Sequence, residues 1–546
     1  MKLLPWQRVV LALSGVLLGL ANPAPALAET YVPINGAGSS WAANAVNQWI
    51  SAVHQSGMRV DYSANGSSDG RQRFLQHTVD YAASDIPFQQ HPTDGGSPEN
   101  PAPGTYAYMP IVAGGTSFMY NLRIGGRQVT NLRLSGEVVA KIFTGGITRW
   151  DDQAIKNDNP GLTMPASKIV PVIRSDGSGS SAQFSLWMQA QQSGIWSEFC
   201  RQRGCGNGAA SYWPNFPGAV SKAGDLGVAS YVAQGYSEGA IGYVQYSYAI
   251  NAGFPVVKLL NAAGYYVEPT PLNVAVALLK AKISENPDPA VYLTQDLTDV
   301  YKYEDPRVYP MSSYSYFILP TTVTGNFSEA KGKTLAAFSS YFECEGQQQA
   351  PDLGYSPLPR NLVEASFKQI AKIPGAQPPS KPLESCNNPT FTPDGHNRLA
   401  DVAPQPQACD KRGPGQCTTG TGGKKNQPTP VNAGAQSANQ AAGGGQGGGQ
   451  SGQNGQNGGP GATGSAGTGG PSAAPSLSYD PATDQYVGAG GGSGGGGDPG
   501  VGAVPIAMPT GEGWTAAQTL MLIAGLATLA LVLGPGLVSW MLRRRQ

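Results

Sequence analysis

The 546-residue sequence is poor in the residues that metal centres and nucleic-acid surfaces require. It has only four histidines, His54, His77, His91 and His396, all in polar surroundings, and no Cys/His spacing typical of zinc sites. Its 35 lysines and arginines balance 35 acidic residues, without a basic block in the part of globular composition. We therefore expect no metal, no other cofactor and no nucleic-acid partner.

The N-terminus has the organisation of an export signal. Basic residues flank an apolar run over 9–21, and Ala26-Leu27-Ala28 forms a small-x-small cleavage site before Glu29. No cysteine follows this site, so a lipid-modified N-terminus is not expected. The sequence predicts a signal peptide over 1–28 and a mature chain outside the cytoplasm.

The C-terminus has the composition of a membrane anchor. Residues 516–542 are almost all apolar or small, and a helix of this length crosses a hydrocarbon core of roughly 30 Å. Three arginines follow, which is typical of a cytoplasmic flank, so 543–546 are predicted as a cytoplasmic tail. The segment AMPTG at 507–511 has its proline misplaced for a sortase site, which favours retention by the helix.

Between these ends the composition changes sharply. Residues 29–375 have globular texture, whereas 376–512 are rich in Gly, Ser, Gln, Asn, Ala and Pro. Such a stretch buries too little apolar surface to fold, so a disordered linker is predicted there. A Gly-rich coil of this length has a root-mean-square span of roughly 60–70 Å.

The six cysteines form an even set in an exported chain, so structural disulfides are expected. Six cysteines allow fifteen pairings. Cys200–Cys205 and Cys409–Cys417 are close in sequence and are the preferred pairs, which leaves Cys344–Cys386 as the third.

The globular region alternates strand and helix patterns. Apolar runs at 109–122 and 168–175 predict buried strands, and 41–55 and 181–192 predict helices with an apolar stripe. This alternation is typical of an α/β architecture with largely parallel sheets. About 345 residues are more than a single hydrophobic core usually holds, so two lobes are expected.

Three Gly/Ser-rich stretches each follow a predicted strand and open a predicted helix. They are GAGSSW at 36–41, NGSSDG at 65–70 and RSDGSGSS at 174–181. Free backbone N–H groups and small hydroxyls at helix starts attract anions. Each stretch alone is also explained as an ordinary helix cap, with Ser39 or Ser40 capping the first helix and Ser67 or Ser68 the second.

Charged residues beside these stretches sharpen the hypothesis. Arg174 can bind an oxyanion or a carboxylate in bidentate fashion, and Asp176 is well placed to hold its guanidinium. Asp85 ends the segment VDYAASD, where an ionised carboxylate is unusual unless it accepts hydrogen bonds. Together these residues predict a pocket for a small oxyanion that carries its own proton, which points to phosphate.

Longer strings resemble the periplasmic phosphate-binding proteins of high-affinity phosphate ABC transporters. The resemblance covers nearly all of 31–375, including 134–162, 238–249 and SYSYFILP at 313–320. It implies a two-lobed, hinged periplasmic-binding-protein (Venus-flytrap) fold. Lobe 1 would take about 31–110 and 310–375 and lobe 2 about 111–309, with hinge crossings near Met109-Pro110 and Tyr309-Pro310.

The resemblance also implies a ligand set. The phosphate contacts would fall on Ser40, Trp41, Ser67, Asp85, Arg174, Ser178, Gly179 and Ser180, with Asp176 pairing with Arg174. The family more often has Thr-Phe where this chain has Ser40-Trp41, but the hydroxyl and the backbone N–H are kept.

The expected function is extracytoplasmic binding of inorganic phosphate and its delivery to the permease subunits of an ABC importer, by a monomer without enzymatic activity. The alternatives are a surface phosphate sensor, a structural or adhesive surface protein and, with least support, a phosphoryl-transfer enzyme. Family members are typically free in a periplasm or held by a lipid. The single-pass anchor therefore suggests a Gram-positive cell membrane with the binding domain outside.

Overall fold

The computed structural model describes residues 31–288, 291–377, 383–392 and 394–443, and two short strands further on. Contacts divide the chain into two units, 1–459 and 460–546, and each is described by itself. The predicted signal peptide and the predicted span over 516–542 lie outside the described residues. Among the described helices, none has the length and apolarity needed to cross a bilayer.

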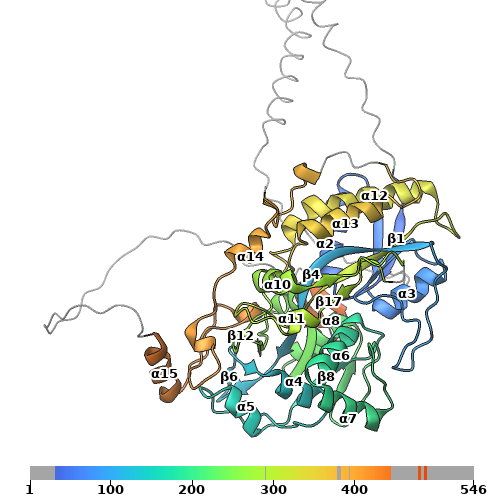
Figure 1. The fold of residues 1–546 in the computed structure, drawn as a ribbon. Coiled ribbons are helices and arrows are strands. Elements are labelled where there is room, and N and C mark those ends of the chain that lie inside the picture. The colour runs from blue at the N-terminus through green and yellow to red at the C-terminus, as the bar shows by residue number, and fades with distance from the viewer. Residues whose placement is uncertain are drawn as a thin grey trace, which may run out of the picture. The chain divides into compact units, whose positions relative to one another are not determined.

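An eight-stranded sheet runs through the first unit in the order β2-β1-β3-β15-β4-β10-β8-β9 (Figure 1). Its lobe 1 strands are β1 (Ile34–Gly38), β2 (Val60–Ser63), β3 (Tyr81–Ser84) and β15 (Ser312–Pro320). β1 lies between β2 and β3 in parallel, and β15 is antiparallel to β3. The lobe 1 helices are α2 (Ala43–His54), α3 (Ser67–Leu75), α12 (Glu329–Cys344) and α13 (Arg360–Ile370).

Strand β4 (Tyr106–Tyr120) connects the two lobes and is buried along its whole length. It pairs with β15 over 106–115 and with β10 (Ala240–Gln245) over 116–120. The change of partner therefore lies later in the chain than the predicted crossing near Met109-Pro110. The second predicted crossing, near Tyr309-Pro310, lies just before β15.

Lobe 2 completes the sheet with β8 (Val170–Arg174) and β9 (Val220–Lys222), both parallel to their neighbours. Its helices are α4 (Gly136–Phe143), α5 (Gln153–Asp158), α6 (Gly179–Gln191), α7 (Ser193–Arg203), α8 (Gly224–Ala233), α9 (Tyr246–Asn251), α10 (Pro271–Ala277) and α11 (Thr298–Tyr301). A smaller sheet joins β7 (Arg133–Leu134), β11 (Lys258–Leu260) and β12 (Tyr266–Val267). Four two-residue strands form two antiparallel pairs: β5 (Arg123–Ile124) with β6 (Arg127–Gln128), and β13 (Lys282–Ile283) with β14 (Gln295–Asp296).

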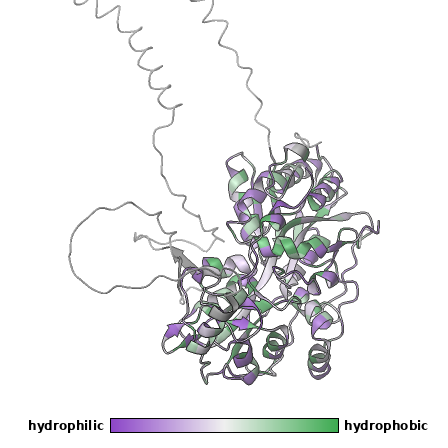
Figure 2. Ribbon diagram, turned by 60° about the vertical axis from the view of Figure 1, so that its left-hand side comes forward, coloured by the Kyte–Doolittle hydropathy of each residue, from purple (hydrophilic) through white to green (hydrophobic). Residues whose placement is uncertain are grey.

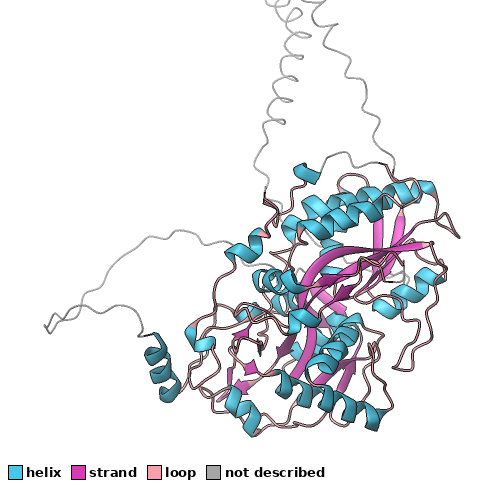
Figure 3. Ribbon diagram, viewed as in Figure 1, coloured by secondary structure: helices cyan, strands magenta, loops and turns pink. Residues whose placement is uncertain are grey.

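Helices flank the strands in both lobes, so the predicted two-lobed α/β architecture is confirmed (Figure 3). β4 and β8 match the strands expected at 109–122 and 168–175, and α2 and α6 match the two expected helices. Hydrophobic residues gather in the interior (Figure 2). One apolar cluster includes Trp49 and Phe342 in lobe 1, and a larger one includes Phe184 and Trp213 in lobe 2.

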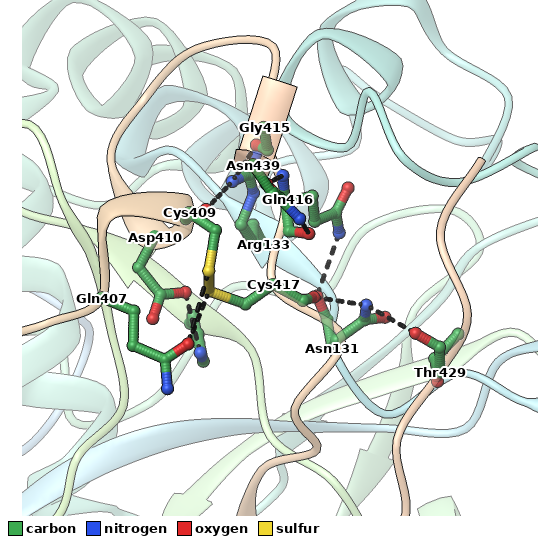
Figure 4. The surroundings of a disulfide bond; sticks show 11 residues. Asn131, Arg133, Gln407, Cys409, Asp410, Gly415, Gln416, Cys417, Thr429 and Asn439 are labelled. Atoms are coloured by element: carbon green, nitrogen blue, oxygen red, sulfur yellow. Dashed lines mark hydrogen bonds and ion pairs between the residues drawn. A yellow bond between two sulfur atoms is a disulfide. The ribbon is translucent and has the colours of Figure 1, made fainter. Parts of the chain in front are cut away.

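All three predicted disulfides are present: Cys200–Cys205, Cys344–Cys386 and Cys409–Cys417. The first closes a short loop after α7, and the second fastens residue 386 to the end of α12. The third lies in a segment that the composition assigns to the linker (Figure 4).

The prediction of a disordered linker from 376 onward is wrong for residues 383–392 and 394–443. They form α14 (Arg398–Val402), α15 (Ala433–Gly443) and the short 3-10 helices η3 (Leu383–Ser385), η4 (Ala408–Asp410) and η5 (Gly422–Lys424). We call residues 383–443 the C-terminal extension. In the second unit, β16 (Leu477–Asp480) and β17 (Gln485–Gly488) pair as an antiparallel hairpin, which the linker prediction also missed.

Polar contacts hold the C-terminal extension against lobe 2. This explains why its polar composition wrongly predicted a disordered linker. Thr421 Oγ1 donates to the carbonyl of Val256 (2.5 Å) and accepts from its N–H (3.0 Å). Gln416, fully buried, accepts from the N–H of Gly161 and donates to the carbonyl of Asn131. Amide and hydroxyl side chains that would be solvated in a coil thus satisfy main-chain groups of lobe 2.

Two buried cations of lobe 2 also depend on the extension, and Figure 4 shows one of them, Arg133. Arg133 Nη1 donates to the carbonyls of Cys409 (3.1 Å) and Gly415 (2.9 Å). Lys258 Nζ lies 2.8 Å from Asp410 Oδ1, and both side chains are about nine-tenths buried. Buried charges without partners are strongly destabilising, so this segment belongs to the folded domain.

Glu343 on α12 is a buried acid without a cationic partner in the described part of the chain. Burial raises the pKa of its carboxyl well above the usual range, and the neighbouring Ser366 hydroxyl offsets this only in part. In the unfolded chain the pKa is the ordinary one, near 4.3. The free energy of unfolding should therefore be highest below that pH and fall as pH rises through the raised pKa.

We expect Glu343→Gln to remove this pH dependence, because the amide has nearly the same shape and no charge. Near pH 7 the variant should be more stable than the wild type by about 1–3 kcal/mol. Melting temperatures measured from pH 4.5 to 8.5 check this. Parallel curves for the two proteins would contradict it.

Candidate functional site

Asp85 lies immediately after β3, in the interior of the protein, and is surrounded by serine hydroxyls. Ser39 Oγ donates to its carboxylate at 2.8 Å, and Ser67 Oγ donates at 3.2 Å. The hydroxyl of Ser315 on β15 donates to Asp85 Oδ1, the oxygen that Ser39 also contacts, whereas Ser67 donates to Oδ2. Three hydroxyl donors from three separate segments therefore fix the orientation of one carboxylate.

The environment of Asp85 disfavours its charge. Burial raises the pKa of Asp85, and the nearby carboxylate of Asp225 raises it further, whereas the hydroxyls of Ser315, Ser39 and Ser67 lower it. The net shift is upward. When ionised, this group is a hydrogen-bond acceptor only.

Arg174 ends β8 and is the cationic centre of the site. Its Nε lies 2.8 Å from Asp176 Oδ1, and its Nη1 lies 2.6 Å from Asp225 Oδ2. Its Nη2 donates to Ser40 Oγ at 2.9 Å, which joins a lobe 2 strand to the first loop of lobe 1. Asp176 thus pairs with Arg174 as the resemblance implies, and Asp225 at the start of α8 is a second partner.

Acidic side chains outnumber the single cation, Arg174, in the site. Burial opposes its charge, but Asp225 and Asp176 outweigh burial and hold the pKa of Arg174 above its ordinary value. Likewise, burial opposes ionisation of Asp176, but Arg174 holds the pKa of this carboxyl below its ordinary value. The guanidinium pairs with Asp176 and Asp225, and Asp85 lies in the same site, so one positive and three ionised acidic groups give the site a formal charge of −2. An anion here must therefore be held largely by N–H and hydroxyl dipoles.

The start of α6 supplies such dipoles. Ser178 caps the helix, with its Oγ accepting from the N–H of Ser181 at 3.2 Å. A Cβ at Gly179 would lie 2.3 Å from Asp85 Oδ2 and 2.5 Å from Ser67 Oγ, so only glycine fits there. The Ser180 hydroxyl is buried and has no hydrogen-bond partner among the described residues. It is available to a ligand.

The first loop combines backbone freedom with fixed side chains. Gly38 has φ +141°, and a Cβ there would overlap the carbonyl of Ala83. Ser40 Oγ donates to Asp225 at 2.6 Å, and its carbonyl accepts from the Tyr248 hydroxyl. The Trp41 indole is buried and donates to Thr116 Oγ1 at 3.1 Å, so this side chain is part of the wall and only its main chain is suited to a ligand.

The caps differ in detail from the sequence-based alternatives. The cap position of α2 is held by Ala42, so the prediction that Ser39 or Ser40 occupies it is wrong, although Ser39 Oγ accepts from the N–H of Ala42. In the second loop Gly66 occupies the cap position, and Ser67 and Ser68 are the first helical residues, so neither of these serines is the cap.

The structure thus brings the predicted residues together from both lobes: Ser40, Trp41, Ser67 and Asp85 from lobe 1, and Arg174, Asp176, Ser178, Gly179 and Ser180 from lobe 2. Sequence reasoning missed Asp225, Ser39 as a donor to Asp85, and Ser315. An acid in the first turn of a helix is commonplace, so Asp225 gave no distinguishing signal. Within the described residues, no group of three His, Cys, Asp or Glu side chains is arranged to hold a metal.

Several known proteins are similar to this chain. The profile of the PBP superfamily domain matches residues 23–345. The phosphate-binding protein PstS of Xylella fastidiosa (strain Temecula1) is 34% identical over 334 residues, which cover 61% of this chain and 83% of that protein. The protein of the same name from Pasteurella multocida is 30% identical over 355 residues, 64% of this chain and 93% of its own length. A solved phosphate-binding protein from Stenotrophomonas maltophilia is 18% identical and covers 61% of this chain and 92% of its own, with a TM-score of 0.46.

Proposed function

The chain belongs to the PBP superfamily, and from that premise we propose that it binds inorganic phosphate between its lobes, outside the cytoplasm, and delivers it to an ABC-type importer. One observation carries the proposal. A buried carboxylate, Asp85, is fixed by hydroxyls beside two helix starts, and no cationic side chain among the described residues pairs with it. Such an acceptor suits an anion that brings a proton with it.

The proposed phosphate ligands are Ser40, Trp41 through its N–H, Ser67, Asp85, Arg174, Ser178, Gly179 and Ser180. Several contacts support this set. Gly179 lies against both Asp85 and Ser67, and the unpartnered hydroxyl of Ser180 is next to it in the chain. Asp176 and Asp225 are assigned a supporting role, because they hold the Arg174 guanidinium from two sides.

Selectivity follows from the protonation of the ligand. Near neutral pH phosphate carries at least one proton and can donate to Asp85, whereas sulfate carries none. Sulfate would meet like charge and leave the carboxylate without a donor. A site that leaves a buried polar group unpaired rejects the wrong ligand by roughly 10⁴ or more.

We expect Asp85→Asn to lose discrimination against sulfate before it loses anion binding. The amide can present its N–H₂ to sulfate, so the ratio of the sulfate Kd to the phosphate Kd should fall at least about a hundredfold. Calorimetric titrations of wild type and variant with both anions at pH 8 measure this ratio.

The matched control is Asp80→Asn. Asp80 is also a buried aspartate of lobe 1, but it pairs with Lys331 at 2.7 Å and lies outside the proposed ligand set. It should leave the selectivity ratio unchanged. Unaltered selectivity in Asp85→Asn would remove Asp85 from the role of proton acceptor.

We further propose that the protein is a monomer held at the membrane by the helix predicted over 516–542, with the binding domain on the outer face of a Gram-positive cell. The apolar composition of 516–542 and the arginines after it support this. Just before α15, the last helix of the C-terminal extension, Asn432 donates to the carbonyls of Gly161 (2.9 Å) and Pro160 (2.7 Å) in lobe 2. The tether would accordingly leave from lobe 2.

A further inference from the structure

We propose that a second contact between the lobes, outside the anion site, acts as a latch that holds the closed form and sets the rate of phosphate release. The proposal rests on the proposed phosphate binding. The latch joins the loop between β3 and β4 in lobe 1 to the loop that follows α7 in lobe 2. Its central residue is Asp94.

Asp94 receives two main-chain donors from the opposite lobe. Its Oδ2 accepts from the N–H of Ser211 at 2.5 Å and from the N–H of Tyr212 at 3.1 Å. Next to it, the carbonyl of Thr93 accepts from the N–H of Gly206 at 2.9 Å. Three hydrogen bonds therefore cross between two loops that opening of the lobes must separate.

On the lobe 2 side the latch reaches the start of α6. The carbonyl of Ser211, whose N–H binds Asp94, accepts from the N–H of Ser178 at 2.9 Å. Ser178 is the cap of α6 and a proposed ligand. The same loop is tightened by the Cys200–Cys205 disulfide. Ser211 thus connects Asp94 directly to Ser178, at the helix start that would face phosphate.

On the lobe 1 side the latch reaches the start of α3. The Asp94 loop is fastened by Glu99, which is buried and accepts from Arg71 Nε at 2.7 Å. The same guanidinium donates to Ser68 Oγ at 3.2 Å. The N–H of Ser68 in turn donates across the lobes to the carbonyl of Gly177 at 3.0 Å. Asp94 is therefore linked to the second Gly/Ser loop through Glu99 and Arg71.

This arrangement makes Asp94 a positioning residue for closure rather than a ligand. Capture of phosphate begins from open lobes, in which Asp94 is apart from Ser211, so the association rate should not depend on it. Release requires reopening, which must break the three bonds. Hydrogen bonds to a charged group are stronger than those between neutral groups, and the partial exposure of Asp94 weakens them in part, so their loss should raise the release rate by at least about tenfold.

The test measures association and dissociation separately in the mature protein with inorganic phosphate. The protein is loaded with radiolabelled phosphate and chased with unlabelled phosphate to obtain koff, while equilibrium dialysis gives Kd, and the ratio of the two gives kon. We expect Asp94→Ala to raise koff at least about tenfold with kon unchanged within twofold, and Asp94→Asn, which keeps a neutral acceptor, to have an intermediate koff. Asp152→Ala is the matched control, because Asp152 accepts from the N–H of Ala154 within lobe 2 alone.

The outcomes separate this inference from the proposed function. Absence of phosphate binding by the wild type would overturn the proposed function, and the latch with it. Wild-type binding with an unchanged koff in both Asp94 variants overturns the latch alone. A lower kon at unchanged koff also overturns it, since Asp94 would then act in capture. If Asp94→Ala does not fold, the comparison of Asp94→Asn with Asp152→Ala decides.

Discussion

Phosphate binding by Arg174→Met is expected to be at least about a thousandfold weaker than that of the wild type. Methionine has a similar length and removes only the charge and the hydrogen bonds. Removing one partner of a buried ion pair costs about 3–5 kcal/mol, because the remaining charge stays buried and unpaired. Here the unpaired groups would be Asp225, fully buried, and Asp176.

The substitution should lower the affinity for phosphate as well as the stability of the fold. Without the guanidinium, three carboxylates lie around the anion, and Ser40 loses the donor that joins it to lobe 2. Calorimetric titration with phosphate measures the affinity, and circular dichroism measures the folded fraction. The double variant Arg174→Met/Asp225→Asn should recover part of the affinity, because it removes one of the repelling charges.

Arg133→Met is the control for this prediction. Arg133 is as buried as Arg174 and also lies in lobe 2, but its guanidinium serves the C-terminal extension. It should lower the melting temperature and leave the phosphate Kd of the folded protein nearly unchanged. If both arginine variants lost affinity equally, the effect would be one of stability, and Arg174 would have no special role at the anion.

Much of the fold could be predicted from the sequence because its signals are local. The apolar run that forms β4 and the striped segments that form α2 and α6 carry their periodicity over a few turns or strand residues. The disulfides followed from chain proximity, since two of the three close loops of only a few residues. The exact place where β4 changes partner is non-local, because it depends on where β15 and β10 meet that strand.

The site was predictable only in part, for a similar reason. Ser67, Gly179 and Arg174 stand in conspicuous Gly/Ser stretches, so their sequence neighbours mark them. Asp225 and Ser315 stand among ordinary helix and strand residues. Their role depends on contacts with residues far away in the chain: Asp225 is 51 positions from Arg174, and Ser315 is 230 positions from Asp85. Contacts at such separations leave no trace in local composition.

The C-terminal extension shows the opposite error, a local signal that misleads. Its Gly, Gln and Asn content is typical of a solvated coil. Yet Gln416, Thr421 and Asn432 each bind main-chain groups of lobe 2. Composition measures how much apolar surface a segment can bury, and it does not count hydrogen bonds to buried carbonyls and N–H groups.

Removing the C-terminal extension is therefore expected to destabilise the whole binding domain. A chain ending at residue 377 would leave Lys258 and Arg133 without Asp410 and the carbonyls they bind. It would also lose the Cys344–Cys386 disulfide, which spans 42 residues and contributes about 4 kcal/mol by the chain-entropy relation. Together these losses should lower the melting temperature by more than about 10 °C.

Two further chains separate the causes. A chain ending at residue 443 keeps the extension and removes everything after it, so its melting temperature should match that of the full mature protein. The same chain with Cys344→Ser and Cys386→Ser loses only the disulfide, and should melt between the other two. If the chains ending at 377 and 443 melted together, the contacts to Lys258 and Arg133 would carry no stability. If the melting temperature instead falls stepwise across the three chains, lobe 2 needs the extension for its stability. The reason is that the extension binds Arg133 and Lys258 beside the sheet formed by β7, β11 and β12.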